Sequence, residues 1–598
     1  MKFAAFALAA STLPLAGCAS YAEPAEVKSG AVQVTADAAF EGISDRFIEA
    51  MTELNPIYGT QLGDHSNDGA LPDISAAGRA RQRAVTQGFL VALKSIDKDR
   101  LSRPSQVDYM LLKNALEYEL WGLDTEQQWA WNPQYYNDMA SYSLYGLVAR
   151  DYAPFAERFD NIVSRMEALP AFLETARSQI DVARVPKVHA ETVSKQNAGI
   201  MAIVDGLIAP QVAAGDFDQA RFDAAREGLQ EAIGEHQEWL DEVVVPGAKG
   251  EFRLGADKYD AKMAFALQSD MTREELKARA EQAYIETRAH MLAVASRIGD
   301  CGLIEAPTHE LRMQAVIECG LEASYENRAT RETLEDAARA TLAQATEFTR
   351  EQGFIRPMDG PVQVITMPEF WQGNAVAYLD APAPLERHLP AYYAVSPIPA
   401  SWSDEQAESF LREYNMSMLH LLSIHEGVPG HALQLDHSNK YEDLLRAVLG
   451  SGPFVEGWAV YSEKVMADAG YLGGMETEEG RYFILNGLKF RLRSIINTLI
   501  DIGIHTEGMS REEAMTLMMD GGFQQEREAA GKWVRANLSS AQLLSYFTGY
   551  SEHVALREEA EKRLGDQFDA RTYHDEVLSY GSPPVKYVRA MMFDLPIE

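Results

Sequence analysis

The chain has 598 residues, 46% of them hydrophobic, which is enough to bury a sizeable core in one large domain or in two lobes. Its 89 acidic residues against 54 basic residues give a formal net charge of −35. Because a surface with that field repels phosphate backbones, we exclude nucleic acid as a partner. The charge could favour cationic substrates, but solubility is the simpler explanation.

The first eighteen residues, MKFAAFALAASTLPLAGC, have the pattern of an export signal. Lys2 precedes an apolar stretch, residues 3–15, that is too short to span a bilayer. The run LAGC, which ends at Cys18, resembles a bacterial lipobox and implies cleavage before Cys18 and acylation of that cysteine. The alternative is an ordinary secretory signal with a chance cysteine. Ala19, in place of aspartate, resembles lipoproteins that are sent to the outer membrane.

We therefore expect a signal peptide over residues 1–17, a flexible tether over 18–35, and a single large helical domain, in one piece or two lobes, over 36–598. No other hydrophobic run reads as a membrane-spanning helix. The protein is expected in the periplasm, held to a membrane, the outer one, only through its lipid anchor.

From residue 36 onward the pattern is mainly helical. Apolar residues recur at three- and four-residue steps from Phe40 to Leu54, and Asn55-Pro56 ends that helix. A second amphipathic helix is expected from Thr272, with a capping box to Glu275, through residue 298.

Cys301 and Cys319 are the only cysteines besides Cys18. In an oxidising compartment they could pair and close a loop. Since the sequence does not place their Cα atoms, a disulfide and two separate buried thiols both stay open.

Residues 360–399 interrupt the helical pattern. Segments 362–367 (VQVITM) and 375–379 (AVAYL) are predicted to be two short strands, separated by a turn at Gly373-Asn374. The prolines that follow are expected to break any regular element. The small sheet could offer an edge to an extended peptide, or it could be a structural hairpin that covers the core.

The next segment holds the candidate metal ligands. One helix is predicted over residues 404–422, and it runs into HEGVPGH at 425–431. In zinc peptidases two histidines four residues apart share a helix face, and the glutamate between them is the base. Here His425 and His431 are six apart, which on an unbroken helix separates them by roughly 120°. A break at Pro429-Gly430 could return His431 to the face of His425; otherwise these are two histidines that flank a helix break.

A third ligand is expected in FVEGWAVYSE. Pro453 marks a helix start, so Glu456 is predicted in the first turn of a second helix. Two histidines and one carboxylate leave a coordination position for water, as in catalytic zinc sites. For Glu456 alone, a favourable interaction with a helix N-terminus would also suffice. Glu463, on the same helix face, could accept a hydrogen bond from a ligating histidine.

HEGVPGHALQ followed by FVEGWAVYSE resembles a bacterial lipoprotein family catalogued as domain-of-unknown-function 885, which is grouped with the gluzincin metallopeptidases. NPIYGTQLGDH and the carboxy-terminal region also look like that family, so the resemblance covers most of the chain. The two-residue insertion extends a series seen in dipeptidyl peptidase III, where one residue is inserted. FVEGWAVYSE is also similar to the segment of thimet-type oligopeptidases that carries their third ligand.

The resemblance implies one zinc ion on His425, His431 and Glu456. It implies a mainly α, elongated multi-helix zinc-peptidase-like fold, with a small β-sheet beside the active-site helix and a deep channel. Many gluzincins place an acid four residues after the ligand glutamate, but Val460 stands there, so Glu463 is the expected substitute.

Further candidates lie toward the carboxy terminus. Asp501 and His505 are four apart on a helical pattern, so the aspartate could orient His505 for a supporting or oxyanion role, or the pair could be a capping salt bridge. By resemblance to helical oligopeptidases, Tyr546 or Tyr550 could hydrogen-bond the tetrahedral intermediate, although either could be a core aromatic. His420, His437 and His574 are weaker candidates.

The functional expectation is zinc-dependent hydrolysis of amide bonds in short peptides, with Glu426 as general base. Two alternatives stay open: a metal-dependent hydrolase of non-peptide amides or esters, and a non-catalytic cell-envelope protein that retains a metal site. The sequence contains no GxSxG, Walker loop or CxxC motif, so serine-hydrolase, nucleotide-binding and thioredoxin functions have little support.

Overall fold

The computed structural model describes residues 35–367, 377–399 and 401–598. The export signal, Cys18, all of the tether up to residue 34 and the turn at 373–374 lie outside the described residues. The protein is mainly helical (73% helix) with a small three-stranded sheet, which confirms the predicted fold class at that level.

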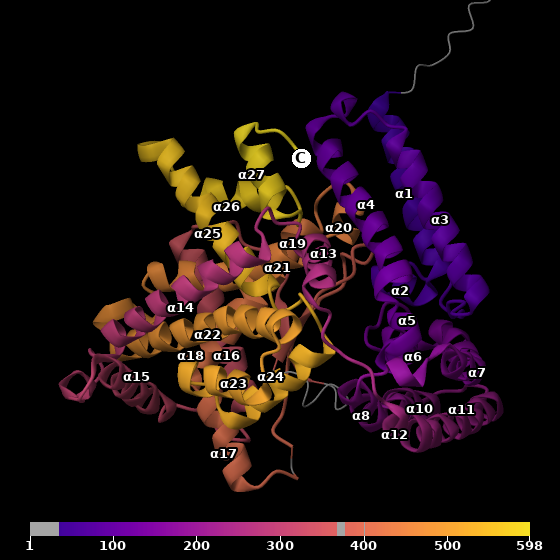
Figure 1. Ribbon diagram of the computed structural model, residues 1–598, viewed down its shortest axis with the longest axis horizontal. Coiled ribbons are helices and arrows are strands. Elements are labelled where there is room, and N and C mark those ends of the chain that lie inside the picture. The colour runs from indigo at the N-terminus through magenta and orange to yellow at the C-terminus, as the bar shows by residue number, and fades with distance from the viewer. Residues whose placement is uncertain (1–34, 368–376, 400) are drawn as a thin grey trace, which may run out of the picture.

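The helices form two lobes (Figure 1). The N-terminal lobe covers residues 36–247, and its largest core cluster consists of side chains from α6, α7, α9, α10 and α11 with the turns between them. Its helices are α1 (Ala36–Leu54), α2 (Pro56–Leu62), α3 (Ala76–Lys94), α4 (Arg103–Trp121), α5 (Gln128–Trp131), α6 (Pro133–Val148), α7 (Phe155–Gln179), α8 (Lys187–Gln196), α9 (Gly199–Ile203), α10 (Ala209–Ala214), α11 (Gln219–Trp239) and α12 (Val245–Gly247).

The C-terminal lobe covers residues 256–598 and contains the predicted metal residues. Its largest core cluster is built around α14, α15 and α22. Its helices are α13 (Ala256–Leu267), α14 (Arg273–Ala295), α15 (His309–Tyr325), α16 (Leu334–Gln352), α17 (Asp404–Glu413), α18 (Met416–Leu422), α19 (His431–Ser438), α20 (Leu444–Val448), α21 (Gly452–Asp468), α22 (Glu478–Ile502), α23 (Arg511–Thr516), α24 (Glu526–Leu538), α25 (Ser545–Leu564), α26 (Ala570–Ser579) and α27 (Val585–Phe593).

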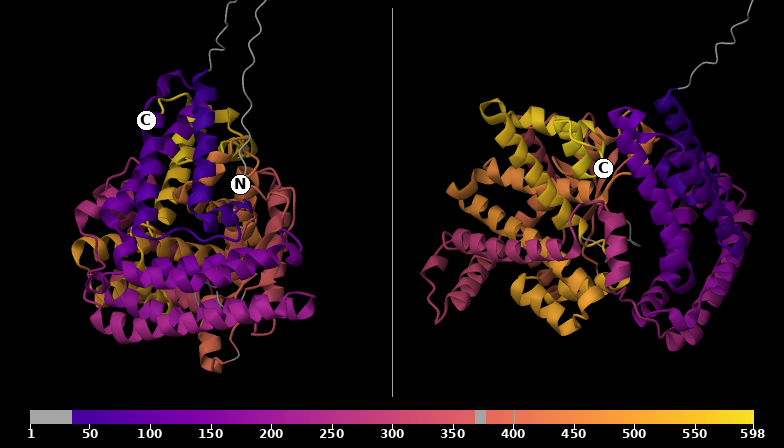
Figure 2. Two further views of the ribbon diagram at one scale, coloured as in Figure 1. Left: turned by 90° about the vertical axis from the view of Figure 1, so that its right-hand side faces the viewer. Right: turned by 45° about the horizontal axis from the view of Figure 1, so that its top comes forward.

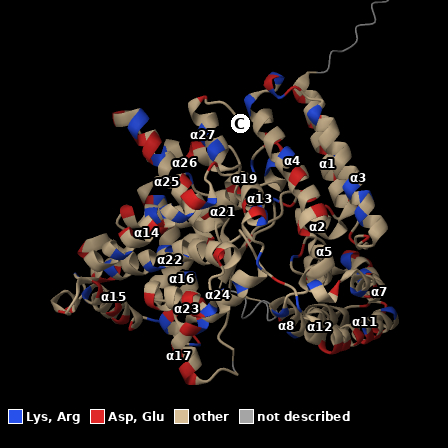
Figure 3. Ribbon diagram, viewed as in Figure 1, with Lys and Arg blue, Asp and Glu red and all other residues tan. Residues whose placement is uncertain are grey.

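The lobes are joined where α4 packs against α20 and α27 (Figure 2). Leu445 of α20 belongs to the core cluster of α1, α3 and α4, and Tyr587 of α27 packs with Leu111 of α4. Arg446 and Asp108 form a buried ion pair across this junction, Nε to Oδ1 at 2.7 Å. Acidic and basic residues are spread along the helices of both lobes (Figure 3).

The sheet has the strand order β1-β3-β2, with β1 (Val362–Thr366) parallel and β2 (Ala377–Asp380) antiparallel to the central β3 (Ala391–Val395). The two predicted strands are present. They do not form a hairpin, which was one of the two alternatives, because each pairs with β3 instead of with the other. The sequence prediction missed β3 because its prolines were read as breakers, whereas Pro390 and Pro397 flank the strand and leave its ladder intact.

The helix boundaries were predicted well in two places and wrongly in a third. α1 ends at Leu54 and Asn55 caps α2, while Thr272 and Glu275 form the predicted capping box of α14. The single helix predicted over 404–422 is two helices, α17 and α18. Asn415 separates them, because its side-chain oxygen accepts hydrogen bonds from the backbone N–H groups of residues 417 and 418 and starts a new helix.

Cys301 and Cys319 form a disulfide with Cα atoms 5.7 Å apart, which decides between the two alternatives left open by the sequence. It ties the turn after α14 to α15.

One helical stretch, residues 187–214, is long and apolar enough to cross a membrane by length and composition, contrary to the expectation that no such run exists. Five of its side chains belong to the core of the N-terminal lobe: Ile200, Ile203, Val204, Ile208 and Val212. This stretch is therefore a core element of that lobe.

Candidate metal centre

The distortion predicted at HEGVPGH is present. After α18 the chain continues as a π turn (Ser423–Gly427), and the N–H of Gly430 then donates to the carbonyl of Ile424 at 2.9 Å before α19 begins at His431. A Cβ on residue 430 would lie 2.1 Å from the carbonyl oxygen of His425 and 2.2 Å from that of Ile424, so only glycine fits there. The wide turn and the glycine bring His431 back beside His425.

Three candidate ligands converge. Nε2 of His425 and Nε2 of His431 lie 3.7 and 3.5 Å from Oε2 of Glu456, and the three ligand atoms all lie within 4.8 Å of one another. The two imidazole rings meet edge to face with centroids 4.7 Å apart. Zinc bonds of about 2.0–2.1 Å in a tetrahedral site separate neighbouring ligand atoms by roughly 3.3 Å. The two histidine–glutamate distances therefore fit a zinc ion with small adjustments.

Glu456 is the fifth residue of α21, just past the first turn in which it was predicted, because α21 starts at Gly452, one residue earlier than expected. This position weakens the alternative explanation for Glu456, a favourable interaction of its charge with the N-terminus of the helix. α21 crosses α25 with backbones in contact: a Cβ on Gly457 would lie 2.2 Å from the carbonyl carbon of Gly549. Two glycines at the crossing thus hold Glu456 at a fixed position against α25.

Glu463 makes the contact predicted for it. Its Oε1 lies 2.8 Å from Nδ1 of His425, and both side chains are buried. A carboxylate there accepts the Nδ1 proton and leaves Nε2 of His425 free to face Glu456 and a metal. Burial raises the pKa of Glu463. Burial also acts on Glu456, but hydrogen bonding to the two histidines outweighs it and lowers the pKa of that carboxyl.

Glu426 is partly buried beside the cluster and is tied to the sheet. Its Oε2 accepts a hydrogen bond from the backbone N–H of Leu379 at 2.9 Å. Leu379 belongs to β2, an outer strand of the sheet, so the strand edge predicted as a peptide-docking feature faces the candidate base. Burial raises the pKa of Glu426, an effect that the positive charges of the histidines oppose.

The two candidate tyrosines differ in surroundings. Tyr546 lines the cavity described below and its hydroxyl accepts a hydrogen bond from Nη2 of Arg535 at 3.2 Å. Burial raises the pKa of Tyr546, and the nearby negative charge of Glu456 raises it further. Tyr550 does not line that cavity, and its ring lies under the guanidinium of Arg491, 4.8 Å away. Tyr546 is therefore the tyrosine on the side of the metal ligands.

The hydrogen bond expected between Asp501 and His505 is not formed within the described residues, although the charge of His505 opposes the increase in the pKa of Asp501 that burial causes. Asp501 accepts hydrogen bonds from the hydroxyl of Tyr259 at 2.5 Å and from the N–H of Ala541 at 3.0 Å, while Nε2 of His505 lies 2.9 and 2.8 Å from the backbone carbonyls of residues 536 and 539. The last turn of this helix is a π turn (Gly503–Glu507), which rotates His505 away from the four-residue register. His505 lines the cavity, but its Nε2 proton is already used by carbonyls.

The weaker histidine candidates are held in other contacts. Nδ1 of His420 lies 2.9 Å from the hydroxyl of Tyr471, and Nε2 of His574 lies 2.8 Å from that of Tyr461. His437 contacts the backbone carbonyl of Arg356. None of the three belongs to the metal-type cluster found among the described residues.

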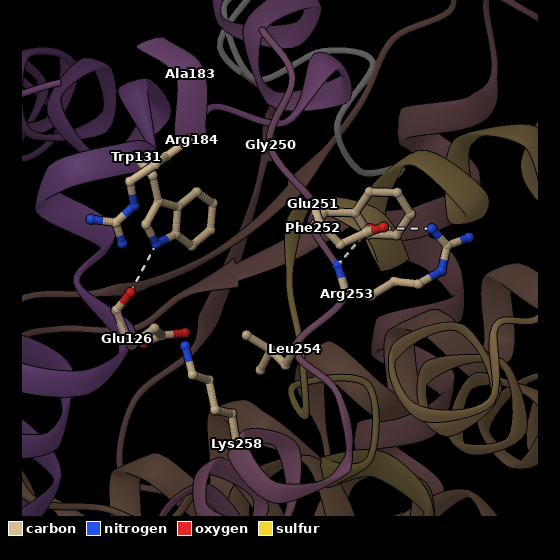
Figure 4. A pocket seen from close by; sticks show the side chains of 10 residues that line it. All are labelled: Glu126, Trp131, Ala183, Arg184, Gly250, Glu251, Phe252, Arg253, Leu254 and Lys258. Carbon is tan, nitrogen blue, oxygen red and sulfur yellow. Dashed lines mark hydrogen bonds and ion pairs between the residues drawn. The ribbon is translucent and has the colours of Figure 1, made fainter. Parts of the chain in front are cut away.

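The cluster opens into a cavity of about 2000 Å³ between the lobes. Tyr118, His189 and Gln196 of the N-terminal lobe line it opposite residues of α21, α22 and α24. A smaller pocket of about 300 Å³ lies at the connection between the lobes (Figure 4). Glu126 lines both cavities, and the carbonyl of Glu126 accepts a hydrogen bond from the indole of Trp131 at 2.8 Å.

Sequence analysis missed several residues of this site. Leu379 acts through its backbone N–H, which has no signal in the side-chain pattern. Gly549 lies among other small residues of α25, such as Ser545 and Thr548, so the sequence did not single it out as the point of contact with α21. Lys532 and Arg535, three residues apart on α24, line the cavity and were detectable only as an ordinary charged helix face.

Fold and site together define a mainly helical, two-lobed protein with a buried two-histidine, one-glutamate cluster beside a large cavity. The chain belongs to the family described as "Bacterial protein of unknown function (DUF885)", which matches residues 56–592. The family resemblance stated from the motifs is thereby confirmed. No curated protein matches the chain.

Two solved structures are similar over nearly the whole chain. A candidate lipoprotein of unknown function from Shewanella oneidensis is 32% identical, with a TM-score of 0.78, and the match covers 92% of this chain and 99% of that one. A candidate lipoprotein from Colwellia psychrerythraea is 16% identical, with a TM-score of 0.74, and the match covers 93% and 98%. The second likeness concerns the fold alone.

Proposed function

We propose that this protein is a zinc-dependent peptidase that hydrolyses amide bonds of short peptides in the cavity between its lobes. The observation that carries the proposal is the convergence of His425, His431 and Glu456, with Glu426 partly buried next to His425 in the same turn. A structural zinc site has four protein ligands and needs no neighbouring glutamate as a general base. Three ligands and an additional glutamate are the composition of a hydrolytic site.

Each residue has a role that follows from its contacts. A zinc ion held by the three ligands would supply Lewis-acid chemistry, polarising the substrate carbonyl and the attacking water. Glu426, oriented by the N–H of Leu379, takes the proton of that water and later passes it to the leaving amine. Tyr546, whose hydroxyl faces the cavity, donates a hydrogen bond to the oxygen that becomes negative.

The cavity favours peptides of several residues over larger or smaller substrates. Its volume of about 2000 Å³ exceeds the roughly 300–1,000 Å³ of ordinary small-molecule sites. Its walls come from both lobes, which leaves room for an extended chain but not for a folded protein. Within the described residues no further strand pairs with the outer edge of β2, and this edge, where the N–H of Leu379 meets Glu426, is suited to hold such a chain in extended form.

The location follows from the amino terminus. We propose that Cys18 is acylated and that the protein works in the periplasm, anchored to the outer membrane. The description of both similar structures as candidate lipoproteins supports the lipid anchor.

The test is the substitution Glu426→Gln, with Glu405→Gln, a change at another cavity-lining glutamate, as the matched control. We expect Glu426→Gln to lower peptide hydrolysis by about 10²–10⁴-fold and to retain bound zinc, and the control to behave as wild type. Mass spectrometry of a peptide library, with zinc added or chelated, measures both.

Full activity of Glu426→Gln would contradict its role as base, and hydrolysis that survives chelation would contradict the metal. Cleavage of esters or non-peptide amides in place of peptides would favour the second class of hydrolase. Bound zinc without any turnover would favour a non-catalytic envelope protein.

A further inference from the structure

Two cations on α24 face the cavity without a carboxylate partner. Lys532 and Arg535 are three residues apart, so they lie on one face of the helix, and both line the cavity. Within the described part of the chain, neither forms an ion pair with a carboxylate; Arg535 donates only to the side-chain oxygen of Gln542 at 3.0 Å and to the hydroxyl of Tyr546. Acidic partners are abundant in a chain with 89 acidic residues to 54 basic ones. A buried lysine and an exposed arginine that both lack one on the same cavity wall therefore indicate a ligand.

Lys532 is the more deeply placed of the two, with 6% of the residue exposed. Glu528, a carboxylate whose charge acts on Lys532, forms no ion pair with it and is already engaged, because Arg493 forms an ion pair with Glu528 and Tyr414 donates a hydrogen bond to it at 3.4 Å. Burial, followed by the positive charge of Arg493, holds the pKa of Lys532 well below its usual range. An anion that enters the cavity would relieve both effects.

Arg535 supplies the geometry for a planar anion. A guanidinium carries five N–H donors, and the two hydrogen bonds of Arg535 use only its Nη2. The remaining donors form no hydrogen bond within the described residues, and a guanidinium has the fork shape that matches a carboxylate.

The two cations share a cavity with the metal cluster. Tyr546 accepts a hydrogen bond from Arg535, and its pKa is raised first by burial and then by the charge of Glu456. Lys532, Arg535, Tyr546 and the three candidate ligands all line this cavity. A group bound at Arg535 therefore lies in the same cavity as the candidate metal ligands.

We propose that Lys532 and Arg535 bind a carboxylate of the peptide substrate, so that the protein selects peptides with a free carboxylate close to the bond that is cleaved. That carboxylate is the C-terminus of the peptide or an acidic side chain near it. The inference deepens the proposed function and rests on it. Binding of a substrate carboxylate differs from stabilisation of the oxyanion by Arg535, because oxyanion stabilisation would favour the cleavage of all peptides equally.

The experiment measures binding by calorimetry to zinc-loaded Glu426→Gln protein, so that hydrolysis does not interfere. The probes are three N-acetylated dipeptides: one with a free C-terminal carboxylate, the same dipeptide as its amide, and an amide with glutamate in last place. The substitutions Lys532→Met, Arg535→Gln and Arg535→Lys are added in turn. Arg527→Gln is the matched control, because Arg527 lines the same cavity from the same helix but stacks on Trp402 at 4.0 Å.

We expect the free acid to bind about tenfold or more tightly than its amide, and this ratio to approach one with Arg535→Gln and to fall with Lys532→Met. Arg535→Lys should keep part of the preference, and Arg527→Gln all of it. Tight binding of the glutamate amide would identify a side-chain carboxylate as an accepted source.

Equal binding of acid and amide, or a preference that survives both Lys532→Met and Arg535→Gln, would overturn the inference. If the wild-type protein cleaves peptide acids and peptide amides equally well, the carboxylate subsite is refuted and the proposed function stands. If the protein binds peptide acids through Arg535 but cleaves no peptide, the proposed function is refuted and the carboxylate subsite stands.

Discussion

The hydrogen bond between Glu463 and His425 allows a quantitative test of how the metal cluster is held. In Glu463→Ala the 2.8 Å contact is lost and the Nδ1 proton of His425 is left buried without an acceptor. The imidazole then loses both its fixed orientation and the charge that strengthens Nε2 as a ligand. Removal of such a partner costs about 10–100-fold in metal affinity, equivalent to about 1.4–2.8 kcal/mol.

Glu463→Gln separates geometry from charge. The amide oxygen can still accept the Nδ1 proton, so the orientation of His425 is kept and only the negative charge is lost. We expect a loss of zinc affinity smaller than in Glu463→Ala. Asp468→Ala, a change to an exposed acid on the same helix, is the control and should leave the affinity unchanged.

The assay is competition for zinc against a chromogenic chelator, together with the thermal unfolding midpoint of each metal-free variant. The unfolding midpoint shows whether a lost affinity reflects a damaged fold. If Glu463→Ala folds normally and binds zinc within about twofold of wild type, then His425 does not depend on Glu463, and our account of the ligand set is wrong.

Three further predictions concern the backbone, a buried acid and the disulfide. Gly430→Ala should lower the unfolding free energy by about 1–3 kcal/mol and reduce bound zinc, as measured by denaturation and metal analysis; wild-type zinc content would contradict the required close approach. Burial raises the pKa of Glu552 to about 7 from 4.5. The folded state therefore binds the Glu552 proton more tightly than the unfolded state does. The stabilisation that this proton provides is complete below pH 4.5 and is lost as the pH rises through 7. Glu552→Gln should then raise the unfolding free energy at pH 8 by up to about 3 kcal/mol with little change at pH 4, and equal effects at both pH values would refute this sign. Cys301→Ser with Cys319→Ser opens a crosslink spanning 18 residues and should lower the unfolding free energy by about 3 kcal/mol without changing zinc affinity, because α15 lies at the margin of its lobe (Figure 1).

The local signals in the sequence were sufficient for much of the fold. Capping residues such as Thr272 and Asn55 act on their own neighbours, so their effect could be predicted without knowledge of the tertiary structure. The pairing of the strands could not be predicted. The central strand β3 pairs with β1, which precedes it by about 30 residues, and with β2, which lies closer in the sequence. No local signal distinguishes this arrangement from a hairpin between β1 and β2. Asn415 carried a usable cap signal that the apolar periodicity of residues 404–422 concealed.

In the candidate site too, features set by adjacent residues could be predicted, and features set by the tertiary structure could not. The convergence of His425 and His431 could be predicted because the break at Pro429-Gly430 is a property of adjacent residues. The failure at Asp501 and His505 arose from a π turn, which adds one residue to a turn without any marker in the side-chain pattern. Arg535 could not be assigned, since its importance depends on which cavity its helix faces.

The contact between Gly457 and Gly549 has a mechanical consequence. With no side chain between the two backbones, α21 and α25 cannot slide or separate without losing that contact, so Glu456 and Tyr546 are fixed to one rigid frame. The metal ligands, Glu426 and Tyr546 all belong to the C-terminal lobe, whereas the N-terminal lobe contributes only walls of the cavity. The N-terminal lobe, held to this frame by contacts such as the buried Arg446–Asp108 ion pair, therefore shapes the space that a peptide would occupy without setting the distances among the reacting groups.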